Sequence, residues 1–237
     1  MADAQWSQGE FGGLPSVAVA AHELKAPLAL IRQLSLVIDA GVAADDAQAL
    51  QQQIRLTAER ALRTVTDLSQ AANMTPSLFP LEPVNPLAVC QQMAREMAPM
   101  MRVYQRQVSW PRGGRMRHLV VANRTLLERI VANFVDNALR YSEASATIQV
   151  KVGQRGDMMR LSVRDFGPMM SRAEYRRLVD EMEQRKSVRT RPDSSGLGVF
   201  VASQFAKAMG GRIGLIRHRD GLTFYVDMPL SRQLSLL

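Results

Sequence analysis

His22 and Glu23 are the first residues of this chain whose types and spacing could do chemistry. They stand side by side near the N-terminus, in the run from His22 to Leu28. A histidine ring is largely unprotonated near neutral pH, so one of its nitrogens can attack a phosphorus atom. The Glu23 carboxylate could accept the proton of the other ring nitrogen. A single His–Glu pair is more often an ordinary surface feature, so its interpretation depends on the motifs that follow.

A second set of polar residues occurs in the run from Asn133 to Tyr141. Asn133 and Asn137 are four positions apart, so a helix would place them on one face. Amide oxygens are neutral, hard ligands that suit a Mg²⁺ ion in contact with phosphates. Arg140 could contact phosphate oxygens, and Tyr141 could lie against a purine face. The alternative is a partly buried helix whose amides are satisfied within the protein.

Two glycine-containing elements complete the set. In the first, Asp165 at the end of a strand can accept a hydrogen bond from an adenine amino group, and Gly167 allows close approach of the backbone. The second opens a helix, where small residues and free backbone N–H groups suit phosphates. It consists of Ser195, Gly196, Leu197 and Gly198. Each element alone is also compatible with a plain turn.

The elements that must position these residues begin with a helical hairpin. Apolar and small residues recur at alternating spacings of four and three from Val17 to Ile38, which indicates a helix packed in a bundle. Gly41 is expected to end this helix, and Asp45 or Asp46 to cap a second one that runs to about Asn73. One hairpin cannot cover both sides of its apolar seam, whereas two hairpins can do so as a four-helix bundle. Packing therefore predicts a homodimer.

The rest of the chain alternates short strands with helices, which predicts an α+β domain. The proline-rich stretch 75–86 reads as a linker with an edge strand near 78–81. Asn85 and Asn123 are expected to cap helices that run to about residue 101 and to residue 141. The remaining expected elements are short strands at 108–110 and 119–121, a hairpin at 147–152 and 158–164, helices at 171–185 and 198–209, and a last hairpin at 212–217 and 222–228.

Composition adds mainly exclusions. The chain has 237 residues, a net charge of +8 and one cysteine, Cys90, so no intrachain disulfide can form. The basic residues are scattered and are not interleaved with aromatics, which argues against nucleic-acid binding. No run of about 18 apolar residues and no signal peptide is evident, so we expect no membrane span in this chain and a cytoplasmic location.

In this order, the four motifs resemble the phosphoacceptor, asparagine and two glycine boxes of the sensor histidine kinases of two-component systems. The resemblance runs from about residue 14 to residue 231. It implies an all-α helical hairpin, a four-helix bundle as a dimer, followed by an α+β sandwich like those of heat-shock 90, gyrase and mismatch-repair ATPases. The implied division is a flexible lead-in at 1–13, a dimerisation and histidine-phosphotransfer hairpin at 14–74, a linker and edge strand at 75–86, and an ATP-binding catalytic domain at 87–237.

The resemblance also implies a reaction with ATP and Mg²⁺. His22, helped by Glu23, would take the γ-phosphoryl group and pass it to an aspartate of a response-regulator receiver domain. Arg189 falls in the segment that matches the family's mobile ATP lid. The residues before the hairpin are too few for a ligand-binding domain, so we expect a fragment of a larger kinase or a kinase that is signalled by a separate sensor protein.

Three positions depart from the family pattern. Met169 stands where a second glycine is usual, and Ser194 stands where the next box usually begins with glycine. Ala26 stands where a threonine or asparagine usually positions the water that dephosphorylates the regulator, so weak phosphatase activity is expected. Two alternatives remain open: a degenerate, non-catalytic dimer that binds and regulates a receiver domain, and a phosphorelay intermediate that takes phosphate on His22 without using ATP.

Overall fold

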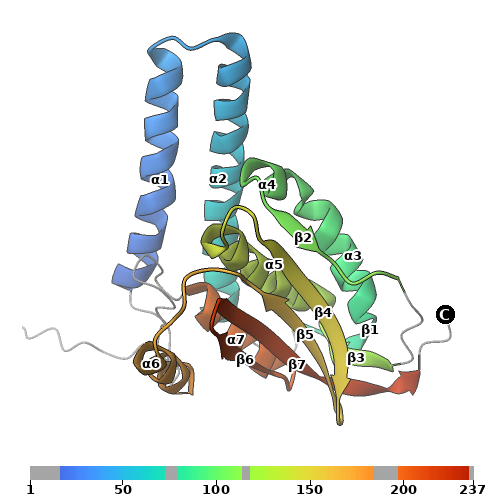
Figure 1. The fold of residues 1–237 in the computed structure, drawn as a ribbon. Coiled ribbons are helices and arrows are strands. Elements are labelled where there is room, and N and C mark those ends of the chain that lie inside the picture. The colour runs from blue at the N-terminus through green and yellow to red at the C-terminus, as the bar shows by residue number, and fades with distance from the viewer. Residues whose placement is uncertain (1–16, 73–78, 114–117, 184–196, 235–237) are drawn as a thin grey trace, which may run out of the picture.

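The structure is a computed structural model, and it describes residues 17–72, 79–113, 118–183 and 197–234. A long helical hairpin stands beside a domain that combines a seven-stranded sheet with further helices (Figure 1). This arrangement confirms the expected fold class of a helical hairpin followed by an α+β domain. Among the helices in these ranges, none combines the length and apolarity that are needed to cross a membrane.

The hairpin consists of α1 (Val17–Asp39) and α2 (Ala44–Ala72). Gly41 makes the turn between them with a φ of 90°, a conformation that glycine adopts without strain. The predicted cap of the second helix is wrong in detail, because α2 already begins at Ala44. Asp45 and Asp46 instead lie within its first turn, where negative charge is favourable to the helix dipole.

The sheet has the order β1-β3-β7-β5-β4-β2, and β6 pairs with β7. Only β2 and β4 run parallel among the strand pairs of the described chain, so the sheet is mixed. Its strands are β1 (Glu82–Val84), β2 (Gln107–Ser109), β3 (His118–Ala122), β4 (Thr147–Arg155), β5 (Met158–Arg164), β6 (Arg212–His218) and β7 (Gly221–Leu234). Its helices are α3 (Pro86–Glu96), α4 (Ala98–Val103), α5 (Arg124–Tyr141), α6 (Arg172–Glu183) and α7 (Leu197–Ala208).

Both predicted asparagine caps are present. The Asn85 side chain accepts hydrogen bonds from the backbone N–H groups at the start of α3, and the Asn123 side chain accepts one from Leu126 N–H at the start of α5. The helix expected to run from 86 to about 101 is interrupted at Met97, and Pro99 lies in the first turn of α4. A proline has no N–H to donate and clashes with the preceding turn, which explains the interruption.

Several strands differ from their predicted bounds, and β4 runs on to Arg155 rather than ending at 152. Two of the differences have a clear structural cause. The edge strand lies at 82–84 rather than 78–81, because Val84 is the residue that reaches the core and pairs with Val120 of β3. The last strand continues beyond residue 228, since its second half pairs with β3 while its first half pairs with β5 and β6. Turn residues predict where a strand begins, but only tertiary pairing decides where it ends.

The core lies between the sheet and helices α3, α5 and α7. Leu126, Ile130 and Phe134 recur on one face of α5 and are buried, and Phe134 stacks on Phe224 of β7 with ring centroids 5.6 Å apart. The opposite face of α5 carries polar side chains and is turned toward α2. The amphipathic pattern of α5 thus fixes which residues face the hairpin.

The lower end of α2 belongs to this same core. Ala71 is buried in the cluster that contains the α5 and α7 side chains, and Leu68 packs against it. The first residues of α7 also contact the hairpin, so the two parts of the chain share one continuous packed interior.

A candidate nucleotide site between the hairpin and the sheet domain

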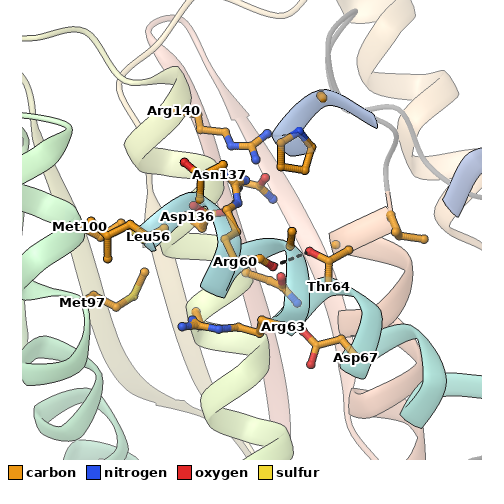
Figure 2. Close-up of a pocket in the computed structure, with 18 of the residues that line it drawn as sticks. Leu56, Arg60, Arg63, Thr64, Asp67, Met97, Met100, Asp136, Asn137 and Arg140 are labelled. Carbon is orange, nitrogen blue, oxygen red and sulfur yellow. Dashed lines mark hydrogen bonds and ion pairs between the residues drawn. The ribbon is translucent and has the colours of Figure 1, made fainter. Parts of the chain in front are cut away.

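A cavity of about 520 Å³ lies where the hairpin meets α4, α5 and α7. Figure 2 shows Asp136, Asn137 and Arg140 turned toward α2, which carries Arg60, Arg63 and Asp67. The volume is in the range of small-molecule sites. Two of the separate sequence motifs, the asparagine run and the second glycine element, therefore contribute residues to one cavity.

The α5 wall holds the predicted phosphate and metal ligands. Asn133, Asn137 and Arg140 occupy successive turns of one helix face and all line the cavity. The side-chain nitrogen of Asn133 is buried and has no hydrogen-bond partner among the residues that the structure describes. A buried amide without a partner costs free energy, and such groups mark positions where a ligand or ordered water completes the bonding.

Gly198, in the first turn of α7, lies directly against this amide. A Cβ atom at Gly198 would be 3.4 Å from Asn133 Oδ1, so the absence of a side chain keeps the amide accessible from that side. Leu197 also lines the cavity. The two motifs are far apart in the sequence, and the packing of α7 on α5 brings them together.

The donor set fits a magnesium-bound nucleotide. Asn133 and Asn137 offer neutral oxygen ligands, and Arg140 offers a cation for phosphate oxygens. Within the described ranges, no group of three His, Cys, Asp or Glu side chains is arranged to hold a metal. The two amides, together with water and phosphate oxygens, would suit a Mg²⁺ ion at the cavity.

Asp165 lies outside the cavity lining, and hydrogen bonds to β7 fix its position. It follows β5 directly and is 3% exposed, and its Oδ1 accepts a hydrogen bond of 2.8 Å from Leu222 N–H. Gly221 must be glycine for this contact, because it has a φ of 129° and a Cβ there would lie 2.4 Å from Asp165 Oδ1. Leu222 also accepts a hydrogen bond from Asp165 N–H, so the carboxylate is held at a fixed place on the sheet edge.

Phe166 is hydrogen-bonded to the two residues that directly follow α5. Phe166 N–H donates to Ser142 Oγ, and Phe166 C=O accepts from Glu143 N–H at 2.8 Å. Gly167 is buried next to them. These bonds bring the first glycine element beside the C-terminal end of α5, although neither Asp165 nor Tyr141 lines the cavity.

The other predicted residues divide into three groups. His22 and Glu23 fall within α1, one turn before Ala26 and Pro27, which do line the cavity. Met169 is 59% exposed and is not part of the lining. Four predicted positions lie outside the described residues: Arg189, Ser194, Ser195 and Gly196.

Residues that the motifs did not single out connect the hairpin to the sheet domain. Arg60 of α2 pairs with Asp136 of α5, with 2.6 Å between Nη2 and Oδ2, and Arg60 also donates to the Tyr104 hydroxyl oxygen. Asp67 of α2 pairs with Arg129 of α5. The sequence does show an Arg and an Asp seven positions apart in each helix, but nothing in it says that the two helices are partners.

Burial shapes the electrostatics of this contact. It raises the pKa of Tyr104, and the nearby Arg60 cation partly opposes that rise. Burial and the neighbouring Arg63 cation lower the pKa of Arg129. Asp67 is therefore an anion beside two cations, and its removal would leave those cations facing each other.

Comparison with known proteins agrees with this architecture. Residues 122–232 match the family described as histidine kinase-, DNA gyrase B-, and HSP90-like ATPase. The chain is 29% identical over 227 residues to the sensor protein SphS of Synechococcus elongatus, covering 91% of this chain and 54% of that protein. It is 31% identical over 216 residues to the sensor protein CutS of Streptomyces coelicolor, covering 89% of this chain and 51% of that protein. The chain thus spans about half the length of these curated relatives.

A solved structure shows the same fold. The crystal structure of full-length ShkA in complex with AMPPNP is similar with a TM-score of 0.61 and 18% identity, covering 93% of this chain and 46% of that one. The similarity extends over both the hairpin and the sheet domain. Because the ATPase family, the sensor proteins and the two-part fold all agree, this chain belongs to the sensor histidine kinases, of which it forms a catalytic core.

Proposed function

We propose that the chain is an ATP-dependent protein-histidine kinase. A ring nitrogen of His22 attacks the γ-phosphorus of ATP, the bond from that phosphorus to the β–γ bridging oxygen breaks, and ADP leaves. Glu23 accepts the proton from the other ring nitrogen. The phosphoryl group then passes from the His22 nitrogen to a carboxylate oxygen of an aspartate on a response-regulator receiver domain.

The observation that carries the proposal is the buried Asn133 side-chain nitrogen, which lies in the cavity beside Gly198 and has no hydrogen-bond partner among the described residues. An amide nitrogen is a donor, so a phosphate oxygen is a partner that would complete its bonding. When bound, Mg²⁺ supplies charge neutralisation on the phosphates. Asn133 and Asn137 hold it, and Arg140 orients the phosphate chain.

The remaining assignments follow the sequence motifs. Asp165, whose position is fixed by the hydrogen bond from Leu222 N–H, selects adenine by accepting a hydrogen bond from its amino group. Gly167 and Tyr141 lie beside it at the base site. The segment from Ser195 to Gly198 receives phosphates, and Arg189 belongs to the ATP lid. Residues 14–74 act as the dimerisation and phosphotransfer hairpin, 75–86 as the linker and 87–237 as the catalytic domain.

We further propose that the hairpin dimerises. Leu28 and Leu36 of α1 and Leu62 and Val65 of α2 are all more than 40% exposed in the single chain. A second hairpin would cover such residues in a four-helix bundle. We also propose that the hairpin takes its signal from a further part of a longer protein or from a separate sensor protein.

The second candidate function is a non-catalytic dimer that binds and regulates a receiver domain. Met169 and Ser194 favour it, because both depart from the family's glycines. The exposed Met169 side chain stands apart from the cavity, however, and leaves the asparagine wall intact. Ala26, which cannot hydrogen-bond a water through its side chain, supports weak phosphatase activity in either case.

The deciding experiment is incubation of the purified chain with γ-labelled ATP and Mg²⁺, beside His22→Gln and Asn137→Ala variants. Kinase activity predicts acid-labile, base-stable label on the wild type that is lost in both variants. Transfer is then followed by adding an isolated receiver domain with and without its aspartate. Absence of label together with absence of nucleotide binding would contradict the kinase proposal and favour the regulatory dimer.

A further inference from the structure

We infer that each chain phosphorylates its own His22, so that autophosphorylation occurs in cis within the dimer. The inference rests on the proposed kinase function and adds which of the two histidines in a dimer is reached. It follows from how the catalytic domain is docked on the hairpin of the same chain.

Two crossed ion pairs set this docking. Arg60 and Asp67 lie seven positions apart on α2, and Arg129 and Asp136 lie seven positions apart on α5. Seven residues are about two helical turns, so each pair of side chains shares one helix face. Arg60 meets Asp136 and Asp67 meets Arg129, which requires α2 and α5 to run antiparallel.

The crossed arrangement permits only one register. A shift of α5 by one turn along α2 would separate both pairs, and a reversal of its direction would oppose Arg60 to Arg129 and Asp67 to Asp136. All four side chains are less than a quarter exposed, so they are poorly screened by solvent. Leu68 and Ala71 add an apolar contact at the end of α2, where they join the core of the sheet domain.

This register directs the phosphate-binding face of α5 toward the helix that carries His22. Asn137 and Arg140 share their cavity with Ala26 and Pro27 of α1 in the same chain. Ala26 lies four residues after His22 and therefore on the same helix face, one turn away. In Figure 2, Asn137 and Arg140 follow Asp136 along α5, beyond the contact of Asp136 with Arg60.

Transfer to the partner's histidine would need this interface to open. Both ion pairs, the Arg60–Tyr104 hydrogen bond and the burial of Ala71 would have to be given up before the domain could reach a second hairpin. Transfer within the chain needs no departure from this hairpin, because the cavity already contains Ala26 of the same chain's α1, one turn from His22. The cavity between the asparagine wall and α1 already provides the space for the phosphates.

Mixed dimers test the inference. Two differently tagged chains are coexpressed, one carrying His22→Gln and the other Asn137→Ala, and the mixed dimer is isolated with both tags. Its only intact catalytic domain and its only phosphoacceptor then lie on different chains. With γ-labelled ATP, we expect label no higher than that of a dimer in which both chains carry both substitutions.

A second mixed dimer supplies the positive signal. Wild-type chain is paired with a chain that carries both His22→Gln and Asn137→Ala. The cis inference expects the wild-type chain to be labelled at its ordinary rate per intact chain, which also shows that a variant partner does not disable the dimer. Label on the Asn137→Ala chain of the first dimer within a few-fold of the wild-type rate, with none in the second dimer, would overturn it.

The proposed kinase function and phosphorylation in cis predict different failures in these assays. If the wild-type homodimer is not labelled at all, the proposed kinase function is wrong and the mixed dimers are silent for that reason. If the chain is a monomer at assay concentration, labelling per chain must be unchanged by a 100-fold dilution. A rate that falls in proportion to the dilution would contradict phosphorylation in cis.

Discussion

Reversing the charge of either member of the Asp67–Arg129 pair should release the catalytic domain from the hairpin, and reversing both should restore the docking. Asp67 has a side chain that is 6% exposed, and Arg129 one that is 22% exposed, so the pair is largely shielded from solvent. A hydrogen bond between charged groups in such a place contributes about 1.5–3 kcal/mol. At about 1.4 kcal/mol per factor of ten, its loss lowers the docking constant about 10- to 150-fold.

The Asp67→Arg variant should lie at the upper end of this range. Its new cation would stand beside Arg63 and Arg129, whose own pKa is already lowered by burial and by Arg63. The double variant Asp67→Arg, Arg129→Asp recreates one ion pair with its charges exchanged. It should recover most of the docking, although not all of it, because the two side chains differ in length.

Two measurements report the effect. The radius of gyration in small-angle scattering should rise in each single variant and return in the double variant, and the rate of autophosphorylation should fall at least tenfold and then recover. Glu128→Arg is a matched control, since Glu128 pairs with Arg124 of the same helix and such intrahelical pairs contribute only a few tenths of a kcal/mol. Single reversals that leave both quantities unchanged, or a double variant without recovery, would refute the reasoning.

Three further results are expected. Ala26→Thr should raise dephosphorylation of the regulator without lowering autophosphorylation, because it supplies the hydroxyl that positions water; an unchanged rate would contradict the assignment. Leu62, 68% exposed on α2, should be covered in the dimer, so Leu62→Glu should raise the dissociation constant in sedimentation more than a hundredfold, at about 1.5–3 kcal/mol per buried leucine and two leucines per dimer, whereas Leu62→Met should not. Burial raises the pKa of Cys90 to about 12, so Cys90 should resist thiol reagents at pH 8 until the protein unfolds. The raised pKa also makes the free energy of unfolding depend on pH: the contribution of Cys90 is complete below about pH 9 and decreases as the pH rises toward 12. A decrease of equal size in Cys90→Ala would argue against this cause.

The features that the sequence predicted well are those that depend on neighbouring residues. Asn85 followed by Pro86, and Asn123 before an amphipathic run, are local capping signals, and both helices begin there. The four-residue spacing of Asn133 and Asn137 also predicted that the two amides share one helix face, and both line the cavity. Local chemistry was sufficient because a cap or a helix face involves only residues within two turns.

The features that the sequence could not predict depend on residues brought together from afar. The hydrogen bond from Leu222 N–H to Asp165 exists because β5 pairs with β7, and nothing near either residue indicates it. The interruption of the helix at Met97 has a local cause in Pro99. The apolar pattern continues across this position, however, and a proline is also tolerated in the first turn of a helix, so the sequence did not show that a second helix begins there. The ion pairs of Arg60 and Asp67 could not be predicted, because they depend on the packing of α2 against α5.

The burial of Leu68 and Ala71 also has a mechanical consequence. Since the last turns of α2 lie inside the core of the sheet domain, no free swivel separates the two parts within the described chain. A rotation of α2 about its own axis should therefore rotate α5 and α7 with it. The hairpin and the sheet domain should accordingly melt as one cooperative unit, with a single calorimetric peak, and a twist applied at the hairpin turns the nucleotide-binding wall with it.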